Sequence, residues 1–367
     1  MIKSCYIHIP FCEKICSYCD FCKMYYNEQL VDSYLDSLEK EISSIYNNEV
    51  LDTIYIGGGT PSCLNNKQLE RLLNIVKNLK LNNNYEYTIE GNFENTTKEK
   101  LDLYKKYGIN RLSFGIESTN TNNLKVLNRT LNKKQVEDII SYSKEIGIDN
   151  INVDLIYALE NENIDILEED INYILSLEVK HISTYSLIIE DNTMLSINKY
   201  KNIDEDLDYE MYKYICNRLK DNNYIHYEIS NFSKEGYESK HNSCYWKNEE
   251  YYGFGLGASS YIANKRITNT RSINNYLKGN VIKEIEELSM KDKIEYEIIL
   301  NLRLNTGINL NNFYNKYKIP FQDIYQYKPL LEQKYLIELN NNLFIPENKW
   351  YISNEIIMKL LGSEVNE

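Results

Sequence analysis

Hydrophobic residues in the first half of the chain are spaced with two alternating periods. Short runs rich in Ile, Tyr and Val are typical of buried strands, and the stretches between them place apolar residues three or four positions apart, as amphipathic helices do. The segment 28–46 has Leu30, Leu38 and Ile42 at helical spacing. The six expected strands are CYIHI (5–9), DTIYI (52–56), YEYTIE (85–90), RLSFGIE (111–117), INVDLIY (151–157) and HISTYSL (181–187).

This alternation predicts an α/β fold with a parallel sheet and right-handed crossovers, because each strand is followed by a helix that returns the chain to the end of the sheet where the strands begin. Six such units favour a partial (β/α)6 TIM-like barrel over residues 1–205. The pattern then changes. Residues 206–287 are dense in aromatic, Gly and Ser residues and predict an α+β extension, and residues 288–367 predict a small helical C-terminal domain.

Unusual residues stand where the predicted strands end. A cysteine loop follows the first strand, the glycine run 57–59 follows the second, and Glu90 and Glu117 end the third and fourth. Asp154 lies in the latter half of the fifth strand. Barrel enzymes carry their chemistry at the carboxyl ends of the strands, so we expect these groups to converge on one mouth.

Composition narrows the class of protein. The chain has 367 residues, 43% of them hydrophobic, which is enough for a large α/β domain and an appendage. Its formal net charge of −13 argues against a general nucleic-acid-binding surface. No apolar run is long enough to span a bilayer, and the first residues read as a strand rather than a signal peptide, so we expect a cytoplasmic protein.

Four of the eight cysteines lie in one short loop, at positions 12, 16, 19 and 22. In a reducing compartment such clustering points to metal binding or catalysis rather than to disulfides. A structural zinc site is the alternative, but zinc sites usually join two Cys/His pairs from separate segments. An iron–sulfur cluster fits best, because three thiolates from Cys12, Cys16 and Cys19 leave one iron open. Cys22 is then a bystander, a sulfur or hydrogen donor, or a fourth ligand that closes the site.

This three-cysteine spacing, with Tyr18 before the last ligand, resembles the radical S-adenosylmethionine (SAM) family. The resemblance implies a [4Fe–4S] cluster whose open iron chelates SAM, and no catalytic side chain is assigned beyond it. It implies that Arg129 pairs with the SAM carboxylate and that Asp154 accepts hydrogen bonds from the ribose. Glu117 stands where the family more often has Gln. The implied cofactor-binding residues are Tyr6, Gly57, Gly58, Gly59, Thr60, Glu90, Glu117, Arg129 and Asp154.

Motifs along nearly the whole chain resemble the oxygen-independent coproporphyrinogen III oxidase-like group of that family. Among them are YIHIPFCEKICSYCDF, YIGGGTPS, GINRLSFGIES and YGFGLGA. The resemblance is closest to the haem-chaperone (HemW-type) branch, because the oxidases have an N-terminal extension and an extra cysteine two places after the third ligand, whereas Cys22 comes three places after Cys19.

That branch has an HNxxYW motif implicated in haem attachment, matched here by His241, Asn242, Tyr245 and Trp246. A neutral imidazole can ligate haem iron, and aromatic neighbours can cover the porphyrin face. Two histidines common in the family are absent, since GRxH reads NRTL at 128–131 and GAHSY reads GASSY at 257–261. The resemblance therefore assigns haem ligation to His241 among the four histidines of the chain.

Three functions follow from these expectations. The first is a haem chaperone that binds the cluster, SAM and haem and passes haem to an acceptor protein. The second is an enzyme that cleaves SAM reductively and decarboxylates the propionate side chains of coproporphyrinogen III. The third is a structural or storage cluster protein, if all four cysteines are ligands. The first two imply an electron donor such as flavodoxin or ferredoxin.

Overall fold

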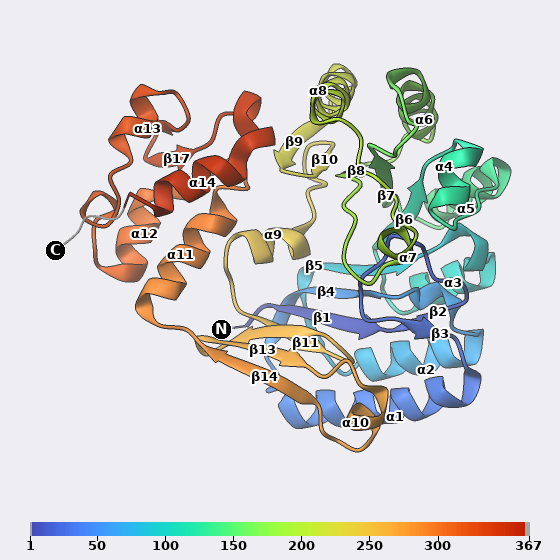
Figure 1. Cartoon of the computed structure of the whole chain (residues 1–367). Helices are drawn as coiled ribbons and strands as arrows, with labels where there is room; N and C mark the ends of the chain where they lie inside the picture. Colours follow the sequence, from blue (N-terminus) through green and yellow to red (C-terminus); the bar gives the residue numbers. More distant parts are fainter. Residues whose placement is uncertain (1, 364–367) are drawn as a thin grey trace.

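The computed structural model describes residues 2–363, and a twelve-stranded sheet forms its centre (Figure 1). Six consecutive strands pair in parallel, as the hydrophobic pattern predicts. They are β1 (Ser4–Ile9), β4 (Val50–Gly58), β5 (Lys80–Gly91), β6 (Arg111–Glu117), β7 (Asn150–Tyr157) and β8 (His181–Ser186). The sheet is mixed and open, because its edge strands β14 and β9 stand at opposite ends of the strand order. The predicted partial barrel is confirmed at this level.

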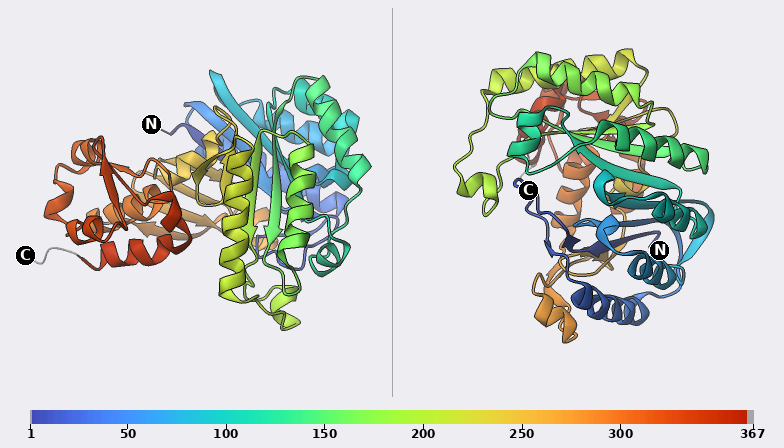
Figure 2. Two further views of the ribbon diagram at one scale, coloured as in Figure 1. Left: turned by 90° about the horizontal axis from the view of Figure 1, so that it is seen from above. Right: turned by 90° about the vertical axis from the view of Figure 1, so that its right-hand side faces the viewer.

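Amphipathic helices cover the outer face of the parallel strands (Figures 1 and 2). They are α1 (Glu28–Ile45), α2 (Asn66–Val76), α3 (Lys98–Lys106), α5 (Lys133–Glu145), α6 (Ile164–Ser176) and α8 (Glu205–Asp221). An Asn, Thr or Asp residue caps the N-terminus of each of these helices. Its side-chain oxygen accepts a hydrogen bond from a backbone N–H of the first turn. In α2, Leu69, Leu72, Leu73 and Val76 are buried against the sheet, as their spacing requires.

The extension joins both edges of the parallel strands. On one side, β10 (Asn231–Ser233) pairs antiparallel with β8 and with β9 (Ile225–Glu228). On the other side, β11 (Tyr251–Phe254) pairs in parallel with β1, and β12 (Ser259–Ile262), β13 (Lys265–Asn269) and β14 (Ile282–Glu287) continue the sheet. The helix α9 (Lys240–Trp246) connects the two sides and contacts β4.

The C-terminal domain has a hydrophobic core of its own and lies beside the barrel (Figure 2). Its helices are α11 (Met290–Asn301), α12 (Leu310–Tyr317), α13 (Lys328–Glu332) and α14 (Ser353–Leu361). Besides these helices it contains a small sheet of β15 (Ile308–Asn309), β17 (Asn342–Phe344) and β16 (Ile337–Leu339). This separate core begins near the predicted boundary at residue 288, although the three boundaries themselves stay predictions.

Shorter elements complete the chain. The strands β2 (Phe11–Cys12) and β3 (Met24–Tyr25) pair in parallel at the two ends of the cysteine loop. The helices α4 (Thr121–Val126), α7 (Met194–Ile197) and α10 (Ile273–Leu277) lie in connections. In the described part of the chain, none of the helices combines the length and the apolar character that crossing a bilayer demands.

Candidate cluster and cofactor site

A cavity of about 620 Å³ lies at the carboxyl ends of the parallel strands. The strand ends, the cysteine loop, the glycine turn and the C-terminal domain all contribute to its wall. Ten of the predicted site residues line it: Cys12, Cys16, Cys19, Gly58, Gly59, Thr60, Glu90, Glu117, Arg129 and Asp154. Four predicted residues that the structure describes are not part of the wall: Tyr6, Gly57, Cys22 and His241.

The cysteine loop is held at both ends and in the middle. The backbone N–H of Tyr26 donates to the carbonyl of Cys12 (2.8 Å), which closes the loop where β2 and β3 pair. Ser17 fixes the middle, because its N–H donates to the Leu127 carbonyl (3.1 Å) and its own carbonyl accepts from the N–H of Leu195 (3.1 Å). The loop therefore presents its three cysteines to the cavity from a defined backbone.

The three thiols suit a metal cluster chemically. Burial raises the pKa of the Cys12 thiol to about 11 and also raises the pKa of Cys19. A thiol in this state gives up its proton when a metal takes its place. Within residues 2–363, no three His, Cys, Asp or Glu side chains converge closely enough to hold a single metal ion. Three cysteines on one cavity wall are thiolate donors of the kind that iron–sulfur clusters take, so the chemistry of this donor set fits such a cluster.

Cys22 is not part of the cavity wall. It packs on Gly257, where an added Cβ would meet the Cys22 Cβ at 2.6 Å. Its backbone carbonyl accepts a hydrogen bond from Nε2 of His8 (2.7 Å). The side chain is buried, and that burial raises the pKa of its thiol. This arrangement favours a packing role for Cys22 and leaves three cysteines on the cavity.

The glycine turn after β4 is folded against the cysteine loop and Glu90. The N–H of Gly58 donates to Oε2 of Glu90 (2.8 Å), and the Tyr55 hydroxyl donates to Oε1 (2.6 Å). Gly58 has a φ of +116°, and a Cβ there would lie 2.4 Å from the His8 ring, so no other residue fits without strain. The hydroxyl of Thr60 donates to the Cys12 sulfur (3.5 Å). The bare backbone of Gly58 and Gly59 therefore borders the cavity beside the cysteine loop.

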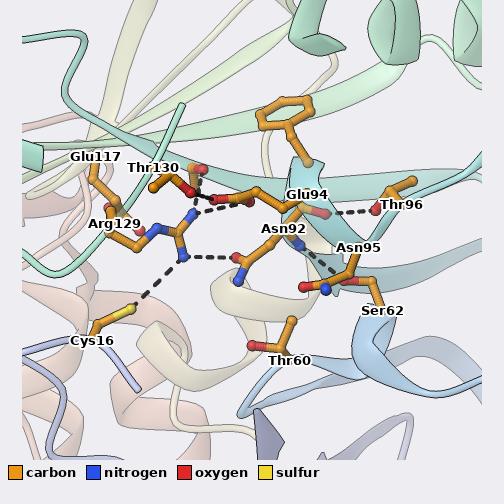
Figure 3. A network of polar contacts seen from close by, with 12 residues as sticks. Cys16, Thr60, Ser62, Asn92, Glu94, Asn95, Thr96, Glu117, Arg129 and Thr130 are labelled. Atoms are coloured by element: carbon orange, nitrogen blue, oxygen red, sulfur yellow. Dashed lines mark hydrogen bonds and ion pairs between the residues drawn. The ribbon is translucent and has the colours of Figure 1, made fainter. Parts of the chain in front are cut away.

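Arg129 is the centre of a polar network beside the cysteine loop (Figure 3). Its Nη1 donates to Oδ1 of Asn92 (2.9 Å) and lies 3.8 Å from the Cys16 sulfur, and its Nη2 donates to the Gly115 carbonyl (3.0 Å). Only 8% of Arg129 is exposed. The guanidinium is thus held rigidly at the cavity wall, as recognition of a carboxylate requires.

Glu117 lies on the same wall with a strained backbone. Its φ is +65°, at the point where the register between β6 and β7 shifts. The hydroxyl of Tyr18 donates to its Oε1 (2.8 Å). Burial raises the pKa of Glu117 to about 7, the charge of Arg129 opposes the increase, and the charge of Asp154 adds to it. Near neutral pH this carboxyl is partly protonated, so it regains some of the donor character of the Gln that the family more often has.

Asp154 completes the group at the strand ends. It lines the cavity, and the amide of Asn152 donates to its Oδ1 (2.8 Å). Burial raises the pKa of Asp154 above its ordinary value. Tyr6 is not part of the wall, and its hydroxyl is 2.9 Å from Nδ1 of His8.

Sequence reasoning missed two contributors to this wall. Asn92 anchors Arg129, and Tyr18 anchors Glu117 across 99 residues of chain. Both stand inside the motifs that were recognised, EGN at 90–92 and the cysteine loop, but only the folded chain reveals what they bind.

His241 lies at the opposite end of the barrel. Its Nδ1 is 2.8 Å from the Thr53 hydroxyl, its Nε2 is 2.7 Å from the Tyr245 hydroxyl, and its ring stacks on Tyr55 at 5.1 Å. The N–H groups of Lys240 and His241 both donate to the carboxylate of Glu86 (3.0 Å each). Burial lowers the pKa of His241 to about 3, so the ring is neutral. Both ring nitrogens have partners, and α9 acts as a plug at the amino ends of the strands.

Comparisons with known proteins agree with this architecture. The family model of the radical SAM superfamily matches residues 6–174, and that of the HemN C-terminal domain matches residues 288–351. The chain is 40% identical to the heme chaperone HemW of Lactococcus lactis subsp. lactis over 99% of this chain and 98% of that protein. It is 35% identical to the heme chaperone HemW of Bacillus subtilis over 98% of this chain and all of that protein (100%).

A solved structure shows the same fold over almost the whole chain. The coproporphyrinogen III oxidase HemN of Escherichia coli, a radical SAM enzyme, superposes with a TM-score of 0.85 at 21% identity, over 97% of this chain and 89% of that one. The chain therefore belongs to the radical SAM superfamily, in the HemW group of proteins with a HemN C-terminal domain.

Proposed function

We propose that the protein is a haem chaperone of the radical SAM superfamily, which binds a [4Fe–4S] cluster, SAM and haem and delivers haem to an acceptor protein. The observation that carries the proposal is the 40% identity, over 99% of this chain, to a protein named heme chaperone. The cavity supports it, because three cysteines share one wall with the glycine turn, Glu117, Arg129 and Asp154.

The residues of the cavity have distinct roles in this proposal. Cys12, Cys16 and Cys19 would hold a [4Fe–4S] cluster through three of its irons, and the cluster would supply one open iron for the binding of SAM. The backbone of the glycine turn borders the methionine part of SAM, with Glu90 holding the turn in place. Arg129 pairs with the SAM carboxylate, because its guanidinium is already oriented by Asn92 and Gly115.

The other cavity carboxyls complete the binding of SAM. Asp154 accepts hydrogen bonds from the ribose hydroxyls, because it lines the cavity from the latter half of β7. Glu117 contacts SAM from the wall that it shares with Arg129. An electron donor such as flavodoxin or ferredoxin and a cytoplasmic location belong to the same proposal.

An oxidase acting on coproporphyrinogen III remains the alternative function. The likeness to the Escherichia coli HemN structure at 21% identity concerns the fold. It does not by itself favour that reaction, so the activity serves as a control in the test below.

The test is an anaerobic haem titration of the cluster-reconstituted protein, followed by its Soret band. The haem-loaded protein is then mixed with apo-myoglobin, and transfer is measured after the two proteins are separated. We expect saturable binding of about one haem per chain, transfer to the acceptor, and no conversion of coproporphyrinogen III under reducing conditions with SAM. Absence of haem binding, or turnover of the porphyrinogen, would contradict the proposal. The variant His241→Ala, titrated in parallel, tests the predicted haem role of that residue.

A further inference from the structure

The cavity extends well beyond the cofactor-binding residues into a second part, which we call the outer lobe. Its wall comes from the end of β8 and the two residues that follow, from α8, and from the C-terminal domain. The residues that define it are Tyr185, Ile188, Tyr212, Arg303, Trp350 and Tyr351. The C-terminal domain is held there by ring contacts, since Tyr351 lies 5.4 Å from Tyr212. Five of these six side chains are aromatic or apolar.

Arg303 is the cation of the outer lobe. Its Nη2 donates to Oδ1 of Asn354 (2.8 Å), and its guanidinium lies 5.8 Å from the Trp246 ring. Glu228 is the acidic neighbour that attracts it, but in residues 2–363 no carboxylate lies within ion-pair distance of Arg303. Burial raises the pKa of Glu228 to about 8, so this neighbour is largely neutral at pH 7. Arg303 therefore faces the cavity without a fully charged counter-ion.

None of the four histidines of the chain lines this cavity, and each already has partners for both ring nitrogens. His8 contacts Tyr6 and the Cys22 carbonyl, and His181 contacts Asn152 and Tyr227. His226 contacts Glu347 and the Ile229 carbonyl, and His241 contacts Thr53 and Tyr245. All four are at least nine-tenths buried. In this conformation no histidine is available to a haem iron in the outer lobe.

We propose that the outer lobe holds the tetrapyrrole itself, with Arg303 pairing with a propionate and the aromatic side chains packing on the ring, and with no bond from a histidine to iron. This inference rests on the proposed haem-chaperone function and assigns the site within it. A guanidinium pairs with a carboxylate through two parallel hydrogen bonds, and aromatic rings pack on a flat π-system. A carrier that contacts only the porphyrin ring and a propionate leaves the haem iron free to bind a ligand of the acceptor protein. This favours release of haem to the acceptor.

The test compares three ligands that separate these contacts: haem, metal-free protoporphyrin IX and protoporphyrin IX dimethyl ester. Binding is measured by quenching of tryptophan fluorescence, since Trp350 lies in the outer lobe and the chain has only 2 Trp residues. We expect protoporphyrin IX to bind within about threefold of haem, because iron contributes little. The dimethyl ester is expected to bind roughly 10- to 100-fold more weakly, because its esterified propionates cannot form the charged hydrogen bonds.

Variants connect these differences to particular residues. Arg303→Gln is expected to weaken haem and protoporphyrin IX by the same roughly 10- to 100-fold and to leave the ester unchanged. Arg71→Gln, outside the cavity wall, is the matched control and is expected to bind all three ligands like the parent. Tyr185→Ala is a second variant in case Arg303→Gln fails to fold, because Tyr185 is 42% exposed. It is expected to weaken all three ligands alike.

The outcomes distinguish this inference from the function on which it rests. Haem binding that survives Arg303→Gln and Tyr185→Ala, or that is lost in His241→Ala while protoporphyrin IX does not bind, overturns the outer-lobe assignment and leaves the chaperone function standing. Failure of the parent protein to bind any of the three ligands overturns both.

Discussion

The buried polar groups at the two ends of the barrel have different surroundings. At the mouth, Arg129 and Glu117 have partners but also face a cavity of about 620 Å³. At the opposite end, His241 and Glu86 are buried, and their hydrogen bonds stay within the wall and the α9 plug. Polar groups of both kinds are costly to bury and therefore need partners. Only at the mouth do these groups border a cavity that has room for a ligand. A sequence motif can therefore be present while its side chains are not accessible to a ligand.

The largest expected effect is the loss of the cluster when a cysteine of the cysteine loop is replaced. Replacing Cys12, Cys16 or Cys19 by Ala removes one of the three proposed cluster ligands, so we expect loss of the cluster and of its visible absorption. Iron and sulfide content after anaerobic reconstitution, with the visible spectrum, measures this loss.

Cys22→Ala is the matched control for these variants, because Cys22 packs on Gly257 rather than lining the cavity. It is expected to reconstitute like the parent, with a small loss of stability from the missing buried sulfur. Loss of the cluster in Cys22→Ala would contradict the three-ligand assignment and revive the fourth-ligand alternative.

The next effect concerns the plug. His241→Ala leaves the buried hydroxyls of Thr53 and Tyr245 without their partner and opens a space beside Tyr55. We expect a loss of about 2–4 kcal/mol in the free energy of unfolding, because each unsatisfied buried group costs about 1–3 kcal/mol. Urea unfolding of the apoprotein measures it, with the exposed Lys247→Ala at the end of the same helix as control. Unchanged stability in His241→Ala would indicate that the plug is not held as described.

Arg129→Gln tests the proposed SAM site at the mouth of the barrel, where we expect a smaller effect. The change removes the cation proposed to pair with the SAM carboxylate, so we expect SAM affinity to fall roughly 10- to 100-fold, as for a charged hydrogen bond. Isothermal titration of the cluster-loaded protein measures it. Arg218→Gln on α8, which is outside the cavity wall, serves as control. Equal affinity in Arg129→Gln and parent would remove Arg129 from the SAM site.

The smallest effect is on how the free energy of unfolding depends on pH. Its sign is opposite for the groups at the two ends of the barrel. The pKa of Glu117 is raised to about 7, so its contribution to stability falls as pH rises from about 4.5 to 7. The pKa of His241 is lowered to about 3, so its contribution falls as pH decreases below about 6.5. Relative to the parent, Glu117→Gln is therefore expected to gain stability as pH rises from 4.5 to 7.

His241→Asn should show the opposite trend and gain relative stability as pH falls from 6.5 to 4. Free energies of unfolding of the apoproteins at pH 4, 5, 6.5 and 8 measure both slopes. Slopes of the same sign in the two variants would contradict the contrast between mouth and plug.

Much of the barrel was predictable from the sequence. The six parallel strands follow from hydrophobic runs and the helices between them, both of which are local properties. The gathering of Glu90, Glu117 and Asp154 at one edge follows as well, because parallel strands end on the same side. The small sheet of the C-terminal domain was not predicted, because its strands are only two or three residues long and show no period.

By itself, the sequence determined the order of strands and helices, the loop with its cysteines, and the family to which they belong. Only the tertiary structure decided which of these side chains face a ligand. It packs Cys22 on Gly257, joins Arg129 to Asn92, and places His241 against Thr53, 188 residues away. The physical reason is that local pattern fixes backbone conformation, whereas the partners of a buried polar group come from segments that meet only when the chain packs.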